Sequence, residues 1–282
     1  MNATRQKILV TGALGQLGLA LQEESKSFTE IDFVFASRSD LDITNRKQLD
    51  HYLDLHKPSF IINTAAYTAV DKAESEKEAT FLINEKGAEN IALACKKRKI
   101  GLIHISTDYV FDGETTVAYK EADAVNPLTV YGQSKLAGEQ AIQNIALTHY
   151  YIIRTSWLYS KKGHNFYNTM LRLAKEAKEI SVVDDQWGSP TLADNLARAL
   201  IHIAITGEAS QSGVYHYTGG GECTWYAFAK AILEKNYPDH TLKPIPASAY
   251  PTAAKRPSYS VLNTSHIENT FGLNIVDWKS VI

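Results

Sequence analysis

Short apolar runs alternate with amphipathic stretches through the first half of the chain. Strands are predicted at 7–10, 33–36, 59–63, 101–106 and 150–154. Helices are predicted from the first glycine turn to about Ser25, from Asp42 to about His56, from Glu76 to about Lys99 and from Tyr131 to about Ile145. The strand runs are too continuously apolar for a sheet with one face in water. This alternation predicts an α/β protein with a Rossmann-type, doubly wound parallel sheet covered by helices on both faces.

The second half of the chain is less regular. Glycine and proline cluster there at 188–190, 219–221, 244–246 and 255–257, and separate short elements. The loss of alternation predicts a boundary near Thr155, with a sheet domain over 1–155 and a smaller C-terminal region over 156–282. An amphipathic helix around 191–206 is expected to rejoin the first domain.

The composition describes an ordinary water-soluble globule. The chain has 282 residues, of which 44% are hydrophobic and 21% charged. A net charge of −2 creates no basic field that would attract nucleic acid, and no apolar run approaches the ~18 residues of a membrane span. The two cysteines, Cys95 and Cys223, are too few for a disulfide framework and fit a reducing cytosol. We expect a cytoplasmic protein without nucleic-acid or membrane partners.

A glycine-rich turn with the spacing G-x-x-G-x-x-G follows the first predicted strand. Gly12 allows a tight turn, Gly15 lets the backbone approach a pyrophosphate, and Gly18 lets the helix pack closely on the strand. The N-terminus of that helix would face the anion. The alternative is a turn that merely needs glycine, but a strand before it and a helix after it favour dinucleotide binding. Residues 1–155 are therefore predicted to bind NAD(P).

The end of the second predicted strand bears on the choice of cofactor. An acidic residue at this place would bind the ribose 2′-hydroxyl of NAD. Arg38 stands there instead, between Ser37 and Ser39. A guanidinium flanked by hydroxyls suits a 2′-phosphate, which favours NADPH, with NADH as the alternative. The competing interpretation is that Arg38 is a solvated loop charge.

Hydroxyl and amine groups then gather near one predicted cleft. Tyr131 and Lys135 are four residues apart on one face of a helix. A phenol has an ordinary pKa of about 10, and a nearby ammonium lowers that pKa toward useful acid–base chemistry. Ser106, Thr107 and Asp108 follow a strand at the carboxyl edge where open α/β sheets bind ligands, and either hydroxyl could bond a carbonyl. Together these groups describe carbonyl reduction, and the histidines show no metal-ligand spacing.

The sequence resembles the dTDP-4-dehydrorhamnose reductase family, a branch of the extended short-chain dehydrogenase/reductases, over almost its whole length. The matching stretches are 10–18, 63–74, 106–111, 126–139, 154–159, 165–166, 185–191 and 256–257. The Ser-Thr-Asp-Tyr-Val-Phe run at 106–111 and the Arg-Thr-Ser-Trp run at 154–157 are more specific to this branch than Tyr-x-x-x-Lys. Within 63–74, Asp71, Lys72 and Glu74 are expected to lie in water at a helix start.

The resemblance implies reduction of the 4-keto group of dTDP-4-dehydro-L-rhamnose to give dTDP-L-rhamnose, the last step in the synthesis of that nucleotide sugar. Nicotinamide would deliver hydride while Tyr131 protonates the oxygen, Lys135 lowers the pKa of the phenol and Thr107 bonds the carbonyl. Lys135 would also hold the nicotinamide ribose. The positions matching the cofactor lining are Gly15, Gln16, Leu17, Asp42, Ile43, Ala66, Tyr67 and Thr68. Those implied to contact substrate are Asp108, Trp157, Asn165 and Arg256, which makes 156–282 mainly a substrate-binding region.

Several alternatives stay open from the sequence. A reductase of another nucleotide 4-keto-6-deoxy sugar would need much the same site. A dehydratase on this scaffold would have two consecutive acidic residues after the threonine. Here Asp108 is followed by Tyr109, so the second carboxylate is missing, which argues against elimination chemistry. Some relatives are regulatory subunits of methionine adenosyltransferase, which bind NADP without turnover. Trp157 could be a core residue.

The resemblance also bears on metals and assembly. Some relatives hold magnesium between subunits through a carboxylate early in the first helix. The corresponding stretch, 18–21, carries no acid, and the chain stops soon after Trp278. We therefore expect no metal site, and either a monomer or a homodimer.

Overall fold

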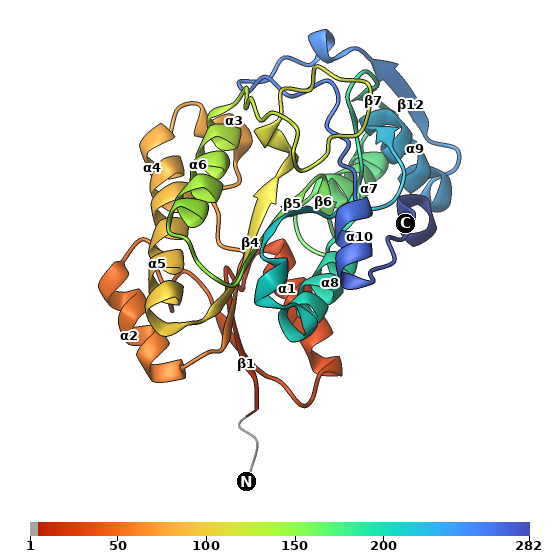
Figure 1. Cartoon of the computed structure of the whole chain (residues 1–282). Helices are drawn as coiled ribbons and strands as arrows, with labels where there is room; N and C mark the ends of the chain where they lie inside the picture. The colour runs from red at the N-terminus through yellow and green to blue at the C-terminus, as the bar shows by residue number, and fades with distance from the viewer. Residues whose placement is uncertain (1–4) are drawn as a thin grey trace.

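A computed structural model describes residues 5–282, and its centre is a six-stranded parallel sheet (Figure 1). The strand order is β10-β5-β4-β3-β1-β2, and every neighbouring pair is parallel. The strands are β1 (Lys7–Thr11), β2 (Asp32–Ala36), β3 (Phe60–Asn63), β4 (Gly101–Thr107), β5 (Tyr150–Thr155) and β10 (Gly213–His216). The predicted Rossmann-type, doubly wound fold is confirmed.

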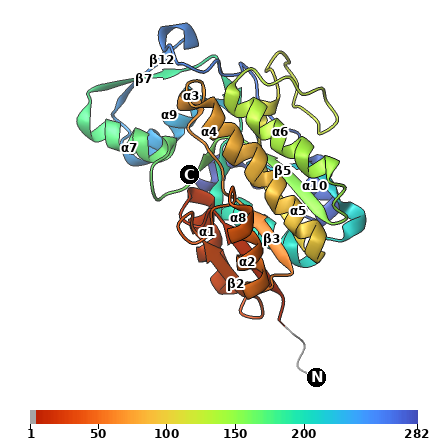
Figure 2. The ribbon, with the colours of Figure 1, turned by 90° about the vertical axis from the view of Figure 1, so that its left-hand side faces the viewer.

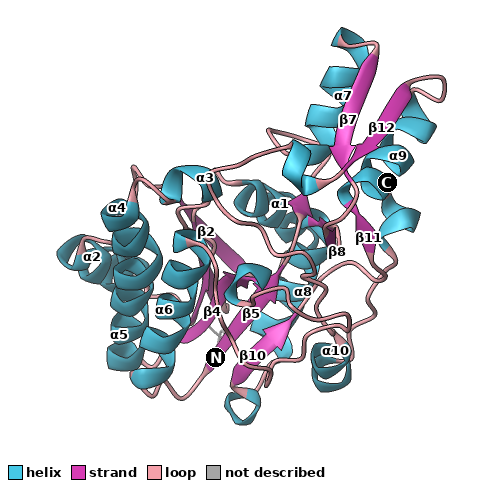
Figure 3. Ribbon diagram, turned by 90° about the horizontal axis from the view of Figure 1, so that it is seen from above, coloured by secondary structure: helices cyan, strands magenta, loops and turns pink. Residues whose placement is uncertain are grey.

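Helices cover both faces of this sheet, as the view from above shows (Figure 3). Helices α1 (Gln16–Glu24) and α8 (Ala193–Thr206) lie on one face, and α2 (Arg46–His56), α5 (Ala88–Arg98) and α6 (Val130–Asn144) on the other. Alternate strand residues point to opposite layers: Ile8 and Val10 join the α1/α8 core, whereas Leu9 joins the α2/α5/α6 core. Burial on both faces explains why the strand segments are uniformly apolar.

Two elements of the sheet layer come from the second half of the chain. Helix α8 packs beside α1, where Leu196 and Leu200 are fully buried. Strand β10 adds to the sheet next to β5 and was not predicted. Its apolar run is short, and its partner strand lies about sixty residues earlier, so no local pattern marks it. The division of the chain at residue 155 stays a prediction.

The predicted helix over 76–99 is interrupted. It consists of α4 (Lys77–Phe81), a π-helical turn η2 (Leu82–Gly87) and α5. A π-turn inside a helix is rare and is frequent at functional sites. The extra residue in the turn places Asn84 in a buried position facing α6, where its side-chain amide donates to Ser134.

A second cluster of elements lies beyond the carboxyl edge of the sheet (Figure 2). Helices α7 (Phe166–Glu176) and α9 (Trp225–Asn236) pack with the parallel pair β7 (Glu179–Val183) and β12 (Thr241–Ile245) around Tyr159, Phe228 and Trp278. The short elements are α3 (Val70–Ala73), β6 (Leu158–Tyr159), β8 (Trp187–Gly188), β9 (Thr191–Leu192), β11 (Cys223–Thr224), α10 (Ser265–Phe271) and single 3-10 turns at 25–27, 108–110, 209–211, 247–249 and 278–281. Within residues 5–282, no helix is both long and apolar enough to cross a membrane.

Candidate active site

The candidate residues converge at the carboxyl edge of the sheet. Because the strands are parallel, the glycine turn after β1, the segment after β3 and the segment after β4 emerge at the same edge. Helix α6 begins beside them, with Thr129 as its N-cap accepting from the Gly132 N–H at 3.0 Å. The site is therefore assembled from segments that the chain order separates.

The glycine turn has a geometry that only glycine tolerates. Gly12 has φ +69°, and a Cβ there would lie 2.7 Å from the backbone nitrogen of Ala65. A Cβ on Gly18 would lie 2.4 Å from the Gly12 carbonyl oxygen. The turn thus brings three backbone segments together, and Gly15, the N-cap of helix α1, provides no side-chain cap. Such a cradle with free helix N–H groups fits a pyrophosphate.

Two residues of the predicted cofactor lining point elsewhere with their side chains. Leu17 is buried in the α1/α8 core, and Ile43 is buried in the opposite core, against Gly87. Only their backbone atoms could meet a cofactor. Gln16 is engaged across the site, where its amide donates to the Leu158 carbonyl at 2.9 Å and accepts from the Asn165 amide at 2.7 Å.

The segment after β2 is a compact polar turn. The Ser37 hydroxyl and backbone N–H both donate to Asp40, at 2.6 and 2.9 Å, and these bonds lower the pKa of that carboxyl. Arg38 is exposed beside them. The carboxyl of Asp42 accepts from the backbone and hydroxyl of Thr44, at 2.9 and 2.7 Å. The Ala13 N–H donates to the Ala36 carbonyl, so this turn adjoins the glycine turn.

Asn84 holds the segment after β3. Its side chain accepts from the Tyr67 N–H at 2.8 Å and donates to the Tyr67 carbonyl at 3.0 Å. The Tyr67 hydroxyl donates to Glu76, while Thr68 is exposed and Ala66 is half-buried. The backbone of this predicted cofactor-lining segment is therefore anchored by a residue that the sequence reading missed, because nothing in the helical pattern of 76–99 marks Asn84.

The structure brings Thr107, Asp108 and Tyr131 together. The Thr107 hydroxyl donates to Asp108 at 3.0 Å and accepts from the Tyr109 N–H. Burial raises the pKa of Tyr131 to about 12, partly offset by a hydrogen bond with Thr107, while the nearby Asp108 carboxylate raises it further. Tyr131 is thus a protonated phenol at neutral pH. Burial also raises the pKa of Asp108 to about 6, and its Oδ2 has no hydrogen-bond partner among the described residues.

Lys135 lies one helical turn after Tyr131 and is fully buried. Its ammonium nitrogen donates to the Ile105 carbonyl at 2.6 Å and lies 3.3 Å from Nε2 of His104. Burial lowers the pKa of Lys135 to about 8, against a smaller effect of Glu139, which raises it. Tyr131 and Lys135 therefore reach the site from one helix face, and His104 is a further neighbour that the sequence reading did not single out.

Trp157, Asn165 and Arg256 all have partners within the protein. Trp157 has a left-handed backbone, φ +46°, and stacks on Trp225 with ring centres 3.5 Å apart. Asn165 is the N-cap of α7, accepting from the Asn168 N–H at 3.0 Å. The Arg256 guanidinium makes a two-point ion pair with Asp71, at 2.7 and 3.2 Å. A substrate would have to compete with that pair or bind beside it.

The expectation that Asp71 and Glu74 are merely solvated is wrong. Asp71 is the partner of Arg256, which lowers the pKa of the carboxyl. Glu74 accepts from the backbone N–H of Val130 at 2.9 Å, at the N-terminus of α6. A carboxylate at a helix N-terminus is stabilised by the helix dipole. Both acids thus connect the helix-α3 segment to neighbouring parts of the site.

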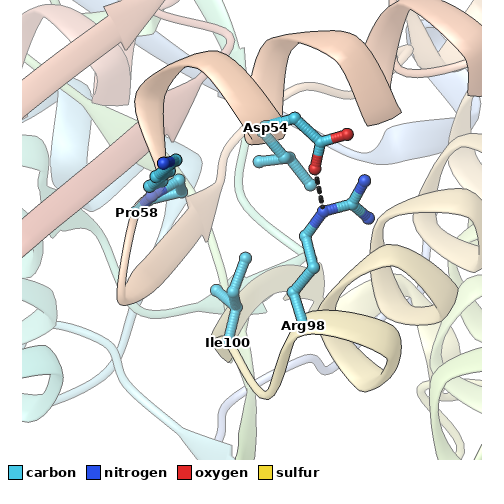
Figure 4. Close-up of a pocket in the computed structure, with 6 residues that line it drawn as sticks. Asp54, Pro58, Arg98 and Ile100 are labelled. Carbon is cyan, nitrogen blue, oxygen red and sulfur yellow. Dashed lines mark hydrogen bonds and ion pairs between the residues drawn. The ribbon is translucent and has the colours of Figure 1, made fainter.

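Within residues 5–282, no three His, Cys, Asp or Glu side chains are grouped as metal ligands would be. A separate hollow lies at the opposite, amino edge of the sheet, lined by Leu53, Asp54, Lys57, Pro58, Arg98 and Ile100 (Figure 4). There the Arg98 side chain donates to Asp54 at 2.9 Å. None of the candidate site residues lines this hollow.

Comparisons with known proteins agree over the whole chain. The sequence model of the RmlD substrate binding domain family matches residues 6–282. A dTDP-4-dehydrorhamnose reductase of Aggregatibacter actinomycetemcomitans is 40% identical over 98% of this chain and 97% of that protein. A dTDP-4-keto-6-deoxy-D-glucose reductase of Streptomyces niveus is 40% identical over 90% of this chain and 87% of that protein. The crystal structure of Bacillus anthracis dTDP-4-dehydrorhamnose reductase in complex with NADP superposes with a TM-score of 0.92, at 40% identity over 98% and 97% of the two chains.

Proposed function

The chain belongs to the RmlD substrate binding domain family, and from this we propose that it is an NADPH-dependent oxidoreductase that reduces the 4-keto group of dTDP-4-dehydro-L-rhamnose to give dTDP-L-rhamnose. One observation supports the chemistry above all others: Thr107 and the protonated phenol of Tyr131 adjoin each other at the carboxyl edge of the sheet, with Lys135 one helical turn further on. The glycine turn ends at the same edge.

The proposed cofactor site consists of the glycine turn and the segments after β2 and β3. The close approach of Gly12 to Ala65 and the uncapped N-terminus of α1 leave a cradle of backbone N–H groups that suits the diphosphate. Arg38 is exposed beside the Ser37 and Ser39 hydroxyls, where it would pair with a 2′-phosphate. NADPH is therefore the proposed cofactor, with NADH as a weaker alternative.

NADPH supplies the hydride when it is bound. Tyr131 then donates its phenolic proton to the oxygen of the substrate, which is a role for an acid that is protonated at neutral pH. Thr107 orients that oxygen through its hydroxyl, after turning away from Asp108. Lys135, one helical turn after Tyr131, is proposed to stabilise the phenolate that remains, because a cation favours the charged form of a phenol.

Substrate contacts are proposed for Asp108, Trp157, Asn165 and Arg256. Asp108 lies next to Thr107 and offers an oxygen that no described residue bonds. Trp157, stacked and half-buried, presents a firm apolar surface for a sugar ring. Asn165 and Arg256 are proposed to face the nucleotide part, where a guanidinium would bind diphosphate. We further propose that the protein acts in the cytoplasm as a monomer or homodimer.

The first experiment follows the absorbance of NADPH, and separately of NADH, on mixing with enzymatically generated dTDP-4-dehydro-L-rhamnose. Oxidation of NADPH with dTDP-L-rhamnose as product is the expected result. Faster oxidation of NADPH than of NADH is expected for the wild type, and Arg38→Ala should narrow that difference. Binding of NADPH without oxidation would contradict the proposal and favour a regulatory subunit.

The role of Tyr131 has its own test. Tyr131→Phe removes the acidic proton while keeping the ring, so we expect kcat to fall by about 10²–10⁴-fold with NADPH affinity nearly unchanged. Tyr109→Phe is a matched control, since Tyr109 packs edge-on against Tyr131 without being the proposed donor. Steady-state kinetics and NADPH fluorescence titration measure both. Retained turnover in Tyr131→Phe would exclude it as the donor.

A second sugar is favoured by one comparison. The Streptomyces niveus relative is a dTDP-4-keto-6-deoxy-D-glucose reductase at the same 40% identity. The same hydroxyl, phenol and amine would serve either ketone, so the two sugars should be compared as substrates. The larger kcat/KM identifies the physiological one.

A further inference from the structure

A chain of buried polar side chains crosses the sheet beneath the site. The Thr11 hydroxyl donates to Oδ1 of Asn63 at 2.6 Å, Nδ2 of Asn63 lies 2.9 Å from Nδ1 of His104, and Nε2 of His104 lies 3.3 Å from Nζ of Lys135. Each of these side chains is at most 2% exposed. The chain therefore links the strand before the glycine turn to the lysine of the site, out of contact with water.

The hydrogen-bond donors in this chain fix the state of His104. The backbone N–H of Ala65 donates to Oδ1 of Asn63 at 3.2 Å, which places the carbonyl of that amide away from the imidazole. The amide nitrogen of Asn63 can only donate, so Nδ1 of His104 must accept. Burial holds the pKa of His104 well below its ordinary value, so the ring is neutral. A neutral imidazole has one N–H, which must then be on Nε2.

This arrangement conflicts with a charged Lys135. An ammonium group has three donors and no acceptor, and the Nε2–H of His104 would point at it. An uncharged amine resolves the conflict, because it accepts from Nε2–H and still donates to the Ile105 carbonyl at 2.6 Å. The other resolution turns the Asn63 amide and reverses the histidine tautomer, which leaves the Ala65 N–H facing a donor.

We propose that His104 is a positioning residue for Lys135, with two coupled states. In one, His104 donates from Nε2–H to an uncharged Lys135. In the other, Lys135 is charged and donates to Nε2, His104 carries its proton on Nδ1, and the Asn63 amide is turned. This inference rests on the proposed function, in which Lys135 supports Tyr131. In this inference, His104 and Asn63 control whether Lys135 is charged and can therefore support Tyr131.

The surroundings of Lys135 allow both states near neutral pH. His104 faces it from β4, Glu139 lies one turn later on α6, and Tyr131 one turn earlier. Glu139 is itself paired with Arg154 of β5 at 2.7 Å, so its charge is largely compensated. Burial lowers the pKa of Lys135 to about 8. The amine and the ammonium are thus both accessible.

The two states also differ at the proposed cofactor edge. In the charged state the Ala65 N–H loses its acceptor, and Ala65 precedes the 66–68 segment and adjoins Gly12. The charge of Lys135 is therefore coupled to the backbone on which the dinucleotide would rest. Lys135 is expected to charge and discharge together with a change in NADPH affinity.

Two substitutions separate the states in opposite directions. Asn63→Asp replaces the amide donor by an oxygen that only accepts, so His104 should protonate on Nδ1 and Lys135 should stay charged to higher pH. His104→Phe leaves the Ile105 carbonyl as the hydrogen-bond partner of Lys135 and replaces the imidazole by an apolar ring, so Lys135 should lose its charge at lower pH. His149→Phe is the matched control, because His149 contacts Phe60 and Tyr151 before β5.

The experiment has two readouts. Long-range ¹H–¹⁵N spectra of histidine-labelled protein report the tautomer, with the His104 signal identified by its loss in His104→Phe. The pH profile of kcat/KM is the second readout: its alkaline limb, the fall in kcat/KM at high pH, is expected to follow the loss of charge from Lys135. We expect Nε2–H in the wild type above that limb and Nδ1–H in Asn63→Asp. The limb should move up by about one pH unit in Asn63→Asp and down in His104→Phe, with kcat roughly tenfold lower in His104→Phe.

The contrary results are equally definite. A wild-type His104 protonated on Nδ1 at every pH, or limbs that stay in place in both variants, would overturn the inference. A purely structural role of His104 would lower stability without moving the limb in opposite directions. If the wild type fails to reduce the keto sugar, the proposed function fails, while the tautomer spectra still test the histidine assignment.

Discussion

Burial sets the acid–base character of the individual groups at this site. It raises the pKa of Asp108 to about 6 and of Tyr131 to about 12, and it lowers that of Lys135 to about 8. All three shifts favour the neutral form, because a charge loses its hydration inside the protein. At neutral pH Tyr131 therefore holds its proton, whereas Asp108 is still mostly ionised and Lys135 still mostly charged, each at a reduced margin.

Asp108 should cost the protein stability at neutral pH. Its folded-state pKa of about 6 is above the ordinary 3.8, so its contribution is favourable at low pH and is lost as pH rises through 6. Asp108→Asn should therefore raise the free energy of unfolding by about 2 kcal/mol at pH 7.5, and by less as pH falls toward 4. Chemical denaturation at several pH values measures this.

Asp112→Asn is the control for that prediction, and it should change the free energy of unfolding in the opposite direction. The pKa of Asp112 is lowered, first by a hydrogen bond from the Glu114 N–H and then by the Tyr119 hydroxyl. Asp112→Asn should lower stability above pH 4 instead of raising it. A stability loss in Asp108→Asn at pH 7.5 would show that its charge is better accommodated than its burial suggests. The kcat/KM profile of that variant should also lack a limb near pH 6.

At the scale of elements, the π-turn in the long helix joins three parts of the site. Asn84 bonds both backbone groups of Tyr67 and the Ser134 hydroxyl on α6. The Ser134 hydroxyl in turn donates to the Tyr131 carbonyl at 2.7 Å. Helix α6 approaches so closely that a Cβ on Gly138 would lie 2.3 Å from the Asn84 carbonyl oxygen. The turn thus sets the distance between the proposed cofactor-lining segment and helix α6.

Asn84→Ala should loosen both connections. It leaves the partly buried backbone groups of Tyr67 without their partner, for which we expect a loss of about 1–2 kcal/mol in unfolding free energy. NADPH affinity should fall more than kcat, because the cofactor-lining segment loses its anchor while Tyr131 and Lys135 keep their helix. Asn236→Ala is the control, since its amide bonds only the Ile232 carbonyl on α9. Unchanged NADPH affinity in Asn84→Ala would contradict the anchoring role.

At the scale of the whole molecule, single polar contacts join the sheet to the second cluster of elements. Gln16 bonds the Leu158 carbonyl and the Asn165 amide, and Asp71 pairs with Arg256. These contacts lie around the proposed cofactor and substrate positions. The position of α7 and of the 254–257 segment is thus tied to the residues that would hold NADPH.

Two substitutions of Asn165 separate its capping role from the bonds that its amide donates, including the one to Gln16. Asn165→Asp keeps an oxygen that accepts from the Asn168 N–H but cannot donate to Gln16 or to the Ser160 and Lys162 carbonyls, whereas Asn165→Ala loses all of these bonds. Because only alanine removes the N-cap, stability should be about 1 kcal/mol lower in the alanine variant than in the aspartate variant. NADPH affinity should fall in both, because Gln16 loses its anchor. Thermal unfolding and fluorescence titration distinguish them, and wild-type affinity in Asn165→Asp would count against the contact.

Most of the fold could be predicted from the sequence. The strands are buried on both faces and are continuously apolar, and the helices show the apolar periodicity of a helix with one buried face. The Tyr131–Lys135 pair and the glycine turn could also be predicted, because both depend on local geometry. Residues four apart share a helix face, and the left-handed φ of Gly12 favours glycine at that position. Strand β10 and the π-turn were not predicted from the sequence. The first depends on a distant partner strand, and the second on the close approach of α6.

The partners of the site residues come from long range. Gln16 meets Asn165 across 149 residues, Asp71 meets Arg256 across 185, and His104 meets Lys135 across 31. No periodicity spans such separations, so the sequence supplied the residue types but not their pairing. Because the protonation of Lys135 and Asp108 depends on those neighbours and on burial, the acid–base chemistry of the site follows from the folded arrangement alone.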